Sequence, residues 1–127
     1  MSLFHQIALS CLPGIGSVLA RNLLSYFGNE EEVFKAKSQH LKKVPGIGPK
    51  NLELIMNHEI FKFVEAELKF IDKYKIKPLF LTDLDYPKRL RNCTDAPVML
   101  YFKGNADLNK SKIISVVGTR NATDYGR

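Results

Sequence analysis

The spacing of apolar residues changes near residue 74 and divides the chain into a helical first part and a second part with strands. Before that point apolar residues recur every three or four positions, the period of a helix packed on one side. Helices are predicted at residues 3–11, 17–27, 38–43 and 49–74, with one more beginning at residue 30. Beyond it, short apolar runs between turn residues predict strands at residues 79–81, 98–102 and 113–117. We therefore expect an α+β chain, with an all-helical bundle at residues 1–73 and an α/β segment at residues 74–127.

The predicted helices carry signals at their ends. Ser17 is a candidate N-terminal cap, Gly28 suits a left-handed C-terminal cap, and Asn29 offers a cap to the helix that follows. Residues 49–74 read as one long helix, in which residues 57–58 are a candidate interruption. The aromatic positions of this helix are assigned to the core, because its apolar residues follow helical spacing over about six turns.

One five-residue pattern occurs twice, at residues 12–16 and again 32 positions later (44 minus 12) at residues 44–48. Each copy has an apolar residue, a proline and Gly-Ile-Gly, and a predicted helix follows. Two glycines around one apolar residue predict a tight turn whose isoleucine points inward. Because the turn also opens a helix, its backbone N–H groups lack partners and form a phosphate-sized anion site. The pattern resembles the helix-hairpin-helix motif.

The two copies supply the first set of candidate phosphate ligands. These are Gly14, Gly16 and Ser17 in the first copy and Gly46, Gly48 and Lys50 in the second. The second copy departs from the motif, because Leu52 stands where a small alanine is usual and Pro49 removes one N–H donor. We therefore expect the first copy to bind phosphate better. The alternative is that both hairpins only pack against each other as a helical core.

The charge of the chain suits a polyanionic partner. The formal net charge is +6 and the pI is near 9.4. Residues 1–73 hold nine Lys and Arg against eight Asp and Glu, a net charge of +1, whereas residues 74–127 hold ten against five, a net charge of +5. The near-neutral helical part leaves open a second interpretation, a protein-docking module whose hairpins are structural and bind no DNA.

Other function classes find little support in the sequence. Cys11 and Cys93 lack metal-ligand spacing and are expected to be free thiols in a reducing compartment. No nucleophile stands beside a base, and Asp83 and Asp85 are assigned to a solvated turn. No apolar run approaches the roughly 18 residues of a membrane span. We therefore expect a non-catalytic, cytoplasmic protein that uses no metal or cofactor and binds no membrane.

A loop with phosphate-binding chemistry follows the last predicted strand. That strand, residues 113–117, is apolar on both faces, which is typical of the centre of a parallel sheet. In the loop, Gly118 lets a ligand approach the backbone, Thr119 can cap a helix and Arg120 can bind a phosphate through two donors. The loop lacks the G-x-G-x-x-G spacing of a dinucleotide site. These three residues form the second set of candidate phosphate ligands.

The order of these pieces resembles one known family. After the paired hairpins come Leu-Asp-Tyr-Pro-Lys-Arg-Leu at residues 84–90, Asp-Ala-Pro-Val-Met-Leu-Tyr-Phe-Lys-Gly at residues 95–104 and Val-Val-Gly-Thr-Arg at residues 116–120. Over the full length of the chain this order is similar to the N-terminal part of the DNA-processing protein A (DprA/Smf) family. The resemblance implies a sterile-alpha-motif-like helical domain at residues 1–73 and the start of a Rossmann-like domain at residues 74–127.

The resemblance also implies a function. Bacterial proteins of that family bind single-stranded DNA and load the recombinase RecA onto it during natural transformation, without catalysis. On this chain the family's Gly-[Ser/Thr]-Arg loop falls on residues 118–120, and Arg120 is expected to hold a DNA phosphate. Tyr86, Tyr101 and Tyr125 are candidates for stacking on bases.

The chain reaches only the beginning of the Rossmann-like fold that the resemblance implies. Most of the family's DNA pocket, its dimer surface and its RecA-contacting region are therefore expected to lie outside it. An incomplete parallel sheet has an unpaired, apolar edge, which favours pairing with another chain. Residues 75–127 are thus expected to associate as a homodimer, to exchange strands between two copies, or to be poorly ordered.

Overall fold

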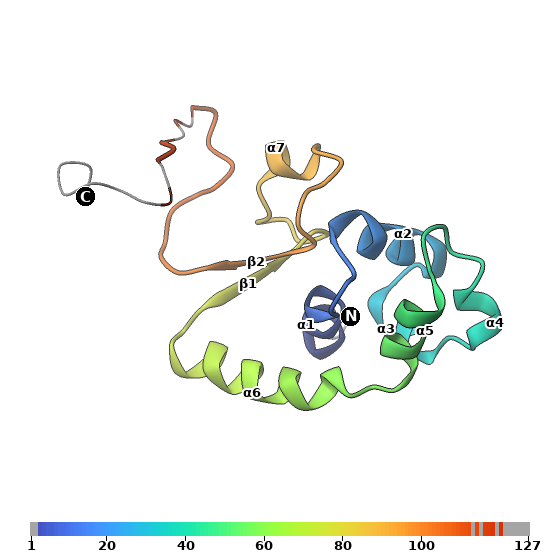
Figure 1. Cartoon of the computed structure of the whole chain (residues 1–127). Helices are drawn as coiled ribbons and strands as arrows, with labels where there is room; N and C mark the ends of the chain where they lie inside the picture. The colour runs from blue at the N-terminus through green and yellow to red at the C-terminus, as the bar shows by residue number, and fades with distance from the viewer. Residues whose placement is uncertain (1–2, 113, 115, 119, 121–127) are drawn as a thin grey trace.

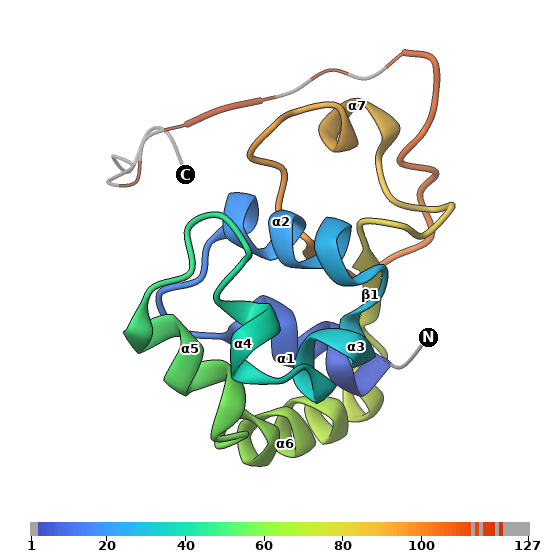
Figure 2. The ribbon, with the colours of Figure 1, turned by 90° about the vertical axis from the view of Figure 1, so that its right-hand side faces the viewer.

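The computed structural model describes residues 3–112, 114, 116–118 and 120. The first part of the chain is a bundle of short helices, namely α1 (Leu3–Cys11), α2 (Ser17–Phe27), α3 (Glu30–Lys35), α4 (Ser38–Leu41), α5 (Pro49–Met56) and α6 (Ile60–Lys73). Helix α1 contacts α2, α3 and α6, so it lies at the centre of the bundle (Figures 1 and 2). The helices predicted at residues 3–11 and 17–27 are confirmed.

The boundary between α2 and α3 uses two of the three predicted caps. Gly28 ends α2 with φ +87°, and its N–H donates back into the helix over 2.8 Å, a geometry that glycine adopts without steric cost. The Asn29 side chain caps α3 by accepting the Glu32 N–H at 3.0 Å. The serine cap is wrong: Ser17 is the first residue of α2, because Gly16 holds the extended backbone of the cap position (φ −84°, ψ −174°).

The long helix predicted for residues 49–74 is two helices, and the break falls at the candidate interruption. His58 lies between them with φ +58°, a left-handed value that an α-helix does not admit. A nitrogen of its ring, Nε2, hydrogen-bonds with the Phe34 carbonyl over 3.1 Å, and Asn57 Oδ1 accepts the Glu59 N–H over 3.0 Å. The break lets α6 leave the line of α5 and pack against α1.

A single hydrophobic core joins the two parts of the chain. Its largest fully buried apolar members come from both parts: Ile7, Leu9, Leu23, Val33, Leu41, Ile55, Val64, Leu79, Phe80 and Tyr86. On the helical side, the rings of Phe4 and Phe34 each meet Phe61 nearly edge to face, with centroids 5.0 and 5.3 Å apart. Because strand residues and helix residues share this core, the second part is packed on the bundle and not merely tethered to it.

The second part begins with a two-stranded antiparallel sheet. Strand β1 (Lys77–Phe80) pairs with β2 (Met99–Phe102) in a register that places Leu79 opposite Leu100. The second strand also contacts α1. The first two predicted strands are therefore confirmed in position, although their ends differ from the prediction by up to two residues.

The third predicted strand is not found among the described residues. Ile114, Val116 and Val117 lie outside any strand and are 90–95% exposed, while residues 113 and 115 lie outside the described residues. A continuous apolar run indicates how deeply a strand would be buried but carries no information about its partner strands. The parallel sheet is thus wrong for the part of the chain that the structure describes, where the two strands are antiparallel, and the Rossmann-like arrangement stays a prediction.

The basic turn that the sequence contains after residue 87 is a short helix, α7 (Lys88–Arg91), whose arginines hold loops together. Arg91 donates to two carbonyls in the turn after β1, over 2.8 and 2.5 Å. Arg89 donates to the carbonyls of residues 110 and 111, over 2.9 and 2.8 Å. Arg91 therefore holds the turn after β1 against α7, and Arg89 holds the segment after β2 against it.

Candidate nucleic-acid interface

Each Gly-Ile-Gly copy forms the tight turn that its sequence predicts. Gly14 and Gly46 have φ values of +73° and +89°, in the left-handed region that glycine enters without steric cost. The N–H of Ile15 closes the first turn by donating to the carbonyl three residues back over 3.3 Å, and Ile47 does the same in the second. Ile15 is buried and Ile47 half-buried, so the inward-pointing isoleucines are confirmed.

Both turns open a helix whose first N–H groups have no side-chain cap. Gly16 precedes α2 and Gly48 precedes α5, and the carbonyl of each glycine accepts the first helical hydrogen bond at 3.0 Å. A glycine has no side-chain oxygen that could accept the N–H groups of the first turn. Those free donors and the positive end of the helix dipole together favour an anion at each turn.

The two hairpins pack against each other reciprocally. A Cβ atom added to Gly46 would lie 3.2 Å from Leu19 Cδ1 in α2, and one added to Gly14 would lie 3.7 Å from Asn51 Oδ1 in α5. Leu19 and Asn51 are 32 positions apart (51 minus 19), as are the two glycines (46 minus 14). Each copy therefore offers the same positions to the other, as in a two-fold symmetric contact. The contact brings both turns to the same side of the bundle (Figure 2).

The first hairpin has an acidic neighbour that sequence reasoning missed. Arg21 of α2 donates to the carbonyl of Cys93 over 2.6 Å and to that of Thr94 over 3.4 Å. The next residue, Asp95, lines a shallow groove of about 540 Å³ between the two hairpins. The negative charge of its carboxylate would repel a phosphate bound at the first turn. Arg21 and Cys93 are 72 positions apart in the sequence, and sequence patterns do not indicate a contact over that distance.

The second hairpin is the more basic of the two. Lys42 and Lys43 precede its turn and Lys50 follows it, and all three residues are exposed. At the first turn Gly16 is exposed and Ser17 is half-buried. The structure does not test the expectation that the first copy binds phosphate better, and it stays a prediction, although the charges around the turns favour the second copy.

Replacing Asp95 by asparagine is expected to strengthen the binding of a single-stranded oligonucleotide about two- to fivefold at low salt. The reason is that one unit charge in this groove repels a nearby phosphate by roughly 1 kcal/mol or less at the dielectric constant of water. Fluorescence anisotropy of a labelled oligonucleotide measures the change. Glu32→Gln is the matched control, since it removes one exposed charge from α3, outside the groove. Equal affinities for Asp95→Asn and the unaltered chain would place DNA away from the groove.

The second set of candidate ligands is not grouped with the hairpins. Gly118 and Arg120 are exposed and lie in irregular backbone, and Thr119 lies outside the described residues. A Cβ atom added to Gly118 would meet no other atom within 4 Å. In Figure 1 the orange and red segment that leads to these residues runs clear of the helical bundle. Their role in holding phosphate therefore stays a prediction.

The prediction that Tyr86 stacks on bases is wrong. Tyr86 is fully buried, its hydroxyl donates to the Pro97 carbonyl over 2.6 Å, and burial raises its pKa. A ring enclosed in this way is not available to a base. Tyr101 is 46% exposed and stays a candidate, and Tyr125 lies outside the described residues.

The aromatic residues of the helix predicted at residues 49–74 were assigned to the core, and this is wrong for three of them. Phe63 and Phe70 are 50% and 51% exposed, and Tyr74, the residue after α6, is 44% exposed. The core side of α6 is filled by Val64 and Ile71. The signal was present in the sequence, since each exposed phenylalanine directly precedes one of these buried residues and so points about 100° away from it.

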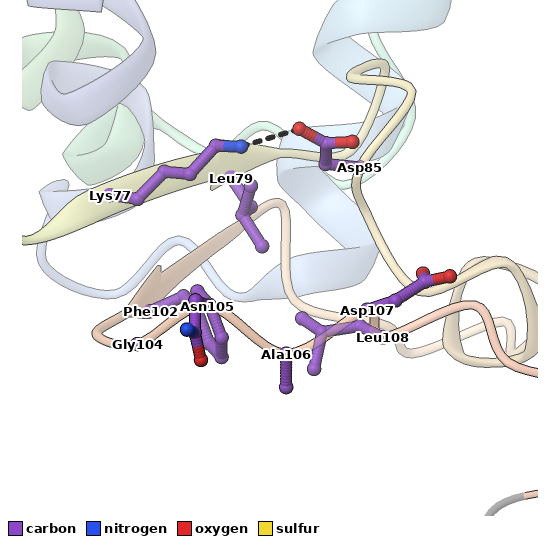
Figure 3. Close-up of a pocket in the computed structure, with 9 residues that line it drawn as sticks. All are labelled: Lys77, Leu79, Asp85, Phe102, Gly104, Asn105, Ala106, Asp107 and Leu108. Atoms are coloured by element: carbon purple, nitrogen blue, oxygen red, sulfur yellow. Dashed lines mark hydrogen bonds and ion pairs between the residues drawn. The ribbon is translucent and has the colours of Figure 1, made fainter.

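Asp83 and Asp85, the carboxylates of the predicted solvated turn, each interact with a different partner. Asp85 forms an ion pair with Lys77 at the rim of a cavity of about 300 Å³ beside β1 and the segment after β2 (Figure 3). Asp83 Oδ2 instead accepts the Phe80 N–H over 2.8 Å.

Among the described residues no group of three or more His, Cys, Asp or Glu is placed to hold a metal. Nor does any helix in this part of the chain combine the length and apolar character needed to cross a bilayer.

Two family models match the chain. Residues 7–58 match the SAM-like helix-hairpin-helix tandem, and residues 77–127 match the DNA recombination-mediator protein A family. The first match covers both Gly-Ile-Gly turns, and the second covers the segment from β1 to Arg127. No solved structure matches the chain significantly.

Curated relatives match either nearly the whole chain or the part with the hairpins. Protein Smf of Synechocystis sp. is 34% identical over an alignment of 132 residues, and this alignment covers 96% of this chain and 32% of that protein. UvrABC system protein C of Wolbachia sp. subsp. Drosophila simulans is 37% identical over 54 residues, 42% of this chain and 9% of that protein. The same protein of Hahella chejuensis is 43% identical over 42 residues, 33% of this chain and 7% of that protein.

The match to Smf decides between these two groups of relatives. It extends over 96% of the chain, whereas the UvrABC matches stop at less than half of it. The chain spans about a third of the length of the Smf relative, since it covers 32% of that protein. With the hairpin tandem and the recombination-mediator segment in this order, the chain belongs to the DNA-processing protein A (DprA/Smf) family.

Proposed function

We propose that this chain binds DNA without catalysis, holding backbone phosphates at the paired hairpins, and that it acts on single strands. The observation that carries the proposal is the reciprocal packing of Gly46 on Leu19 and of Gly14 on Asn51. This packing puts two uncapped helix N-termini on one side of the bundle, where they can hold two phosphates of one strand. Phosphate contacts supply affinity and position but no sequence information, so the expected binding is independent of sequence.

The second set of candidates extends the proposal. Gly118, Thr119 and Arg120 lie within the segment that matches the recombination-mediator family, and we assign to Arg120 a further phosphate contact through its guanidinium. The net charge of +5 in residues 74–127 supports a polyanion near this segment.

Lys50 is the residue that best tests the hairpin contact. In the Lys50→Ala variant the slope of log affinity against log salt should fall by about one, because a single phosphate contact is lost. Anisotropy titrations of a labelled single-stranded oligonucleotide at several salt concentrations measure this slope. Lys35→Ala is the matched control, since that exposed lysine pairs with Glu31 on α3 and lies outside the hairpins.

Two outcomes of this titration count against the proposal. Equal slopes for the Lys50 and Lys35 variants would show that the second hairpin makes no phosphate contact. An absence of binding by the unaltered chain at low salt would favour the protein-docking module, which the net charge of +1 in residues 1–73 supports. Comparison of single-stranded with double-stranded oligonucleotides tests the strand preference.

For the whole protein we propose the roles that the family resemblance implies. These are the loading of RecA onto single-stranded DNA in natural transformation, a homodimeric or strand-exchanged assembly, and a cytoplasmic location. The chain covers 32% of the Smf relative, so assays of RecA loading and of assembly belong on the full-length protein.

A further inference from the structure

We propose that the outward side of α6 is a second DNA contact, which binds unpaired bases by stacking them on exposed aromatic rings. This inference rests on the proposed function and adds the base-binding part of it. The rings belong to Phe63, Phe70 and Tyr74, which are 50%, 51% and 44% exposed. Their spacing of seven and four residues places them in one row along the helix.

The aromatic row is not needed for folding. Val64 and Ile71 of α6 are buried against the bundle, and Leu68 packs beside them. These three residues form the apolar stripe that a helix on the surface of a globular protein requires. The exposed rings lie off this stripe, so the row is surplus to the core. Large apolar side chains gathered on a surface mark an interaction site.

A row of lysines runs beside the aromatic row. Lys62, Lys69 and Lys73 each directly precede one of the three aromatic residues, so they repeat the same spacing of seven and four. All three lysines are exposed, and Lys73 Nζ lies 5.4 Å from the centroid of the Tyr74 ring. Of the ion pairs recorded among the described residues, none involves these lysines. Alternating rings and cations are the surface that single-stranded nucleic acid prefers, because every base has a π face and every linkage a charge.

Acidic residues limit the electrostatic part of this contact. Helix α6 also carries Glu65, Glu67 and Asp72, so three positive charges are matched by three negative ones along the helix. Binding here is therefore dominated by stacking and varies little with salt, unlike the phosphate contacts at the hairpins. That difference separates the two surfaces experimentally.

The aromatic row is continuous with the hairpin interface. Phe63 lines an apolar groove of about 370 Å³ together with Leu12 and Pro13 of the first hairpin. At the other end of the row, the rings of Phe70 and Tyr74 lie with centroids 4.6 Å apart and planes tilted by 45°. The row from Phe63 to Tyr74 extends about 16 Å at the rise of an α-helix. A strand held by its phosphates at the hairpins can thus lay its next bases along α6.

Abasic DNA tests the inference, because it keeps the phosphates and lacks the rings that stack. The whole chain is titrated with a labelled oligothymidine and with an oligonucleotide of equal length whose central nucleotides are abasic. Phe63→Ala and Phe70→Ala should each weaken binding of oligothymidine at least about fivefold and leave binding of the abasic strand unchanged. Tyr26→Ala is the matched control, since it removes a ring from α2 that is 47% exposed. Circular dichroism establishes that each variant is folded.

Three results would overturn the inference. If the Lys50→Ala variant loses affinity and the α6 variants do not, the base contact is absent while the proposed function stands. If the unaltered chain binds neither oligonucleotide, the inference and the proposed function both fall. If the α6 variants instead abolish a concentration-dependent dimer seen by light scattering without DNA, the aromatic row is a contact between copies of this chain.

Discussion

Replacing Tyr86 by alanine is expected to lower the free energy of unfolding by about 3–5 kcal/mol, the range for truncating a large buried aromatic side chain. Tyr86 is the largest of the fully buried side chains and is 0% exposed. Its ring packs under the Arg91 guanidinium, whose central carbon lies 5.5 Å from the ring centroid. Because the site lies between α7 and the segment before β2, the cavity would loosen the second part of the chain. Urea denaturation followed by circular dichroism measures the loss.

Tyr86→Phe separates the ring from its hydroxyl. The ring stays, but the half-buried Pro97 carbonyl loses the donor that reaches it over 2.6 Å, and the loss of such a hydrogen bond costs about 0.5–1.5 kcal/mol. The phenylalanine variant should therefore be intermediate between the unaltered chain and the alanine variant. A loss below about 1 kcal/mol for Tyr86→Ala would mean that the second part of the chain does not unfold together with the helical core.

Burial also gives Tyr86 a predictable pH dependence. It raises the pKa of the hydroxyl above the ordinary value of 10.0, even though Arg21 and Arg91 act in the opposite direction. The folded state thus favours the protonated form, so this contribution is complete below pH 10 and is lost as pH rises through the folded pKa. The free energy of unfolding of Tyr86→Phe should fall less steeply above pH 10 than that of the unaltered chain.

Replacing Gly46 by alanine is expected to cost about 1–3 kcal/mol of folding free energy, whereas Gly48→Ala should change it by no more than about 0.5 kcal/mol. Gly46 has φ +89°, where a side chain is strained, and its new Cβ would lie 3.2 Å from Leu19 Cδ1. Gly48 has φ −98° and open space around the position of a Cβ atom. The two substitutions are chemically identical and two residues apart, so thermal or urea denaturation compares the backbone requirement directly.

The Gly46 variant also tests the reciprocal contact between the hairpins. If the strain loosens this contact, Gly46→Ala should weaken DNA binding as well as stability, since the two helix N-termini would no longer be held together. Gly14→Ala should also be destabilising, because φ is +73° there, although its Cβ would lie at an ordinary contact distance of 3.7 Å from Asn51 Oδ1. Equal stabilities for Gly46→Ala and Gly48→Ala would show that Gly46 does not have a left-handed backbone conformation.

Local patterns in the sequence determined much of the helical part. Gly28 and Asn29 end one helix and begin the next as predicted, because caps depend on residues within one turn. The two Gly-Ile-Gly turns were predictable for the same reason, since positive φ at the first glycine is a local requirement. The repeat of 32 positions indicated that the turns are equivalent. The candidate phosphate ligands at the hairpins therefore follow from the sequence alone.

Tertiary structure decided which residues are enclosed and which charges meet. The sequence favoured Tyr86 as an exposed ring and placed Phe63 in the core, but the packing of distant segments buries the first and exposes the second. Asp95 reaches the hairpin groove because Arg21 holds a loop 72 positions away, and a contact over that distance leaves no periodic signal. The apolar run at residues 113–117 likewise predicted burial without specifying a partner. Hydrophobic periodicity indicates which face of a helix or strand packs on a core. It does not indicate which segments contact each other, because that depends on the whole chain.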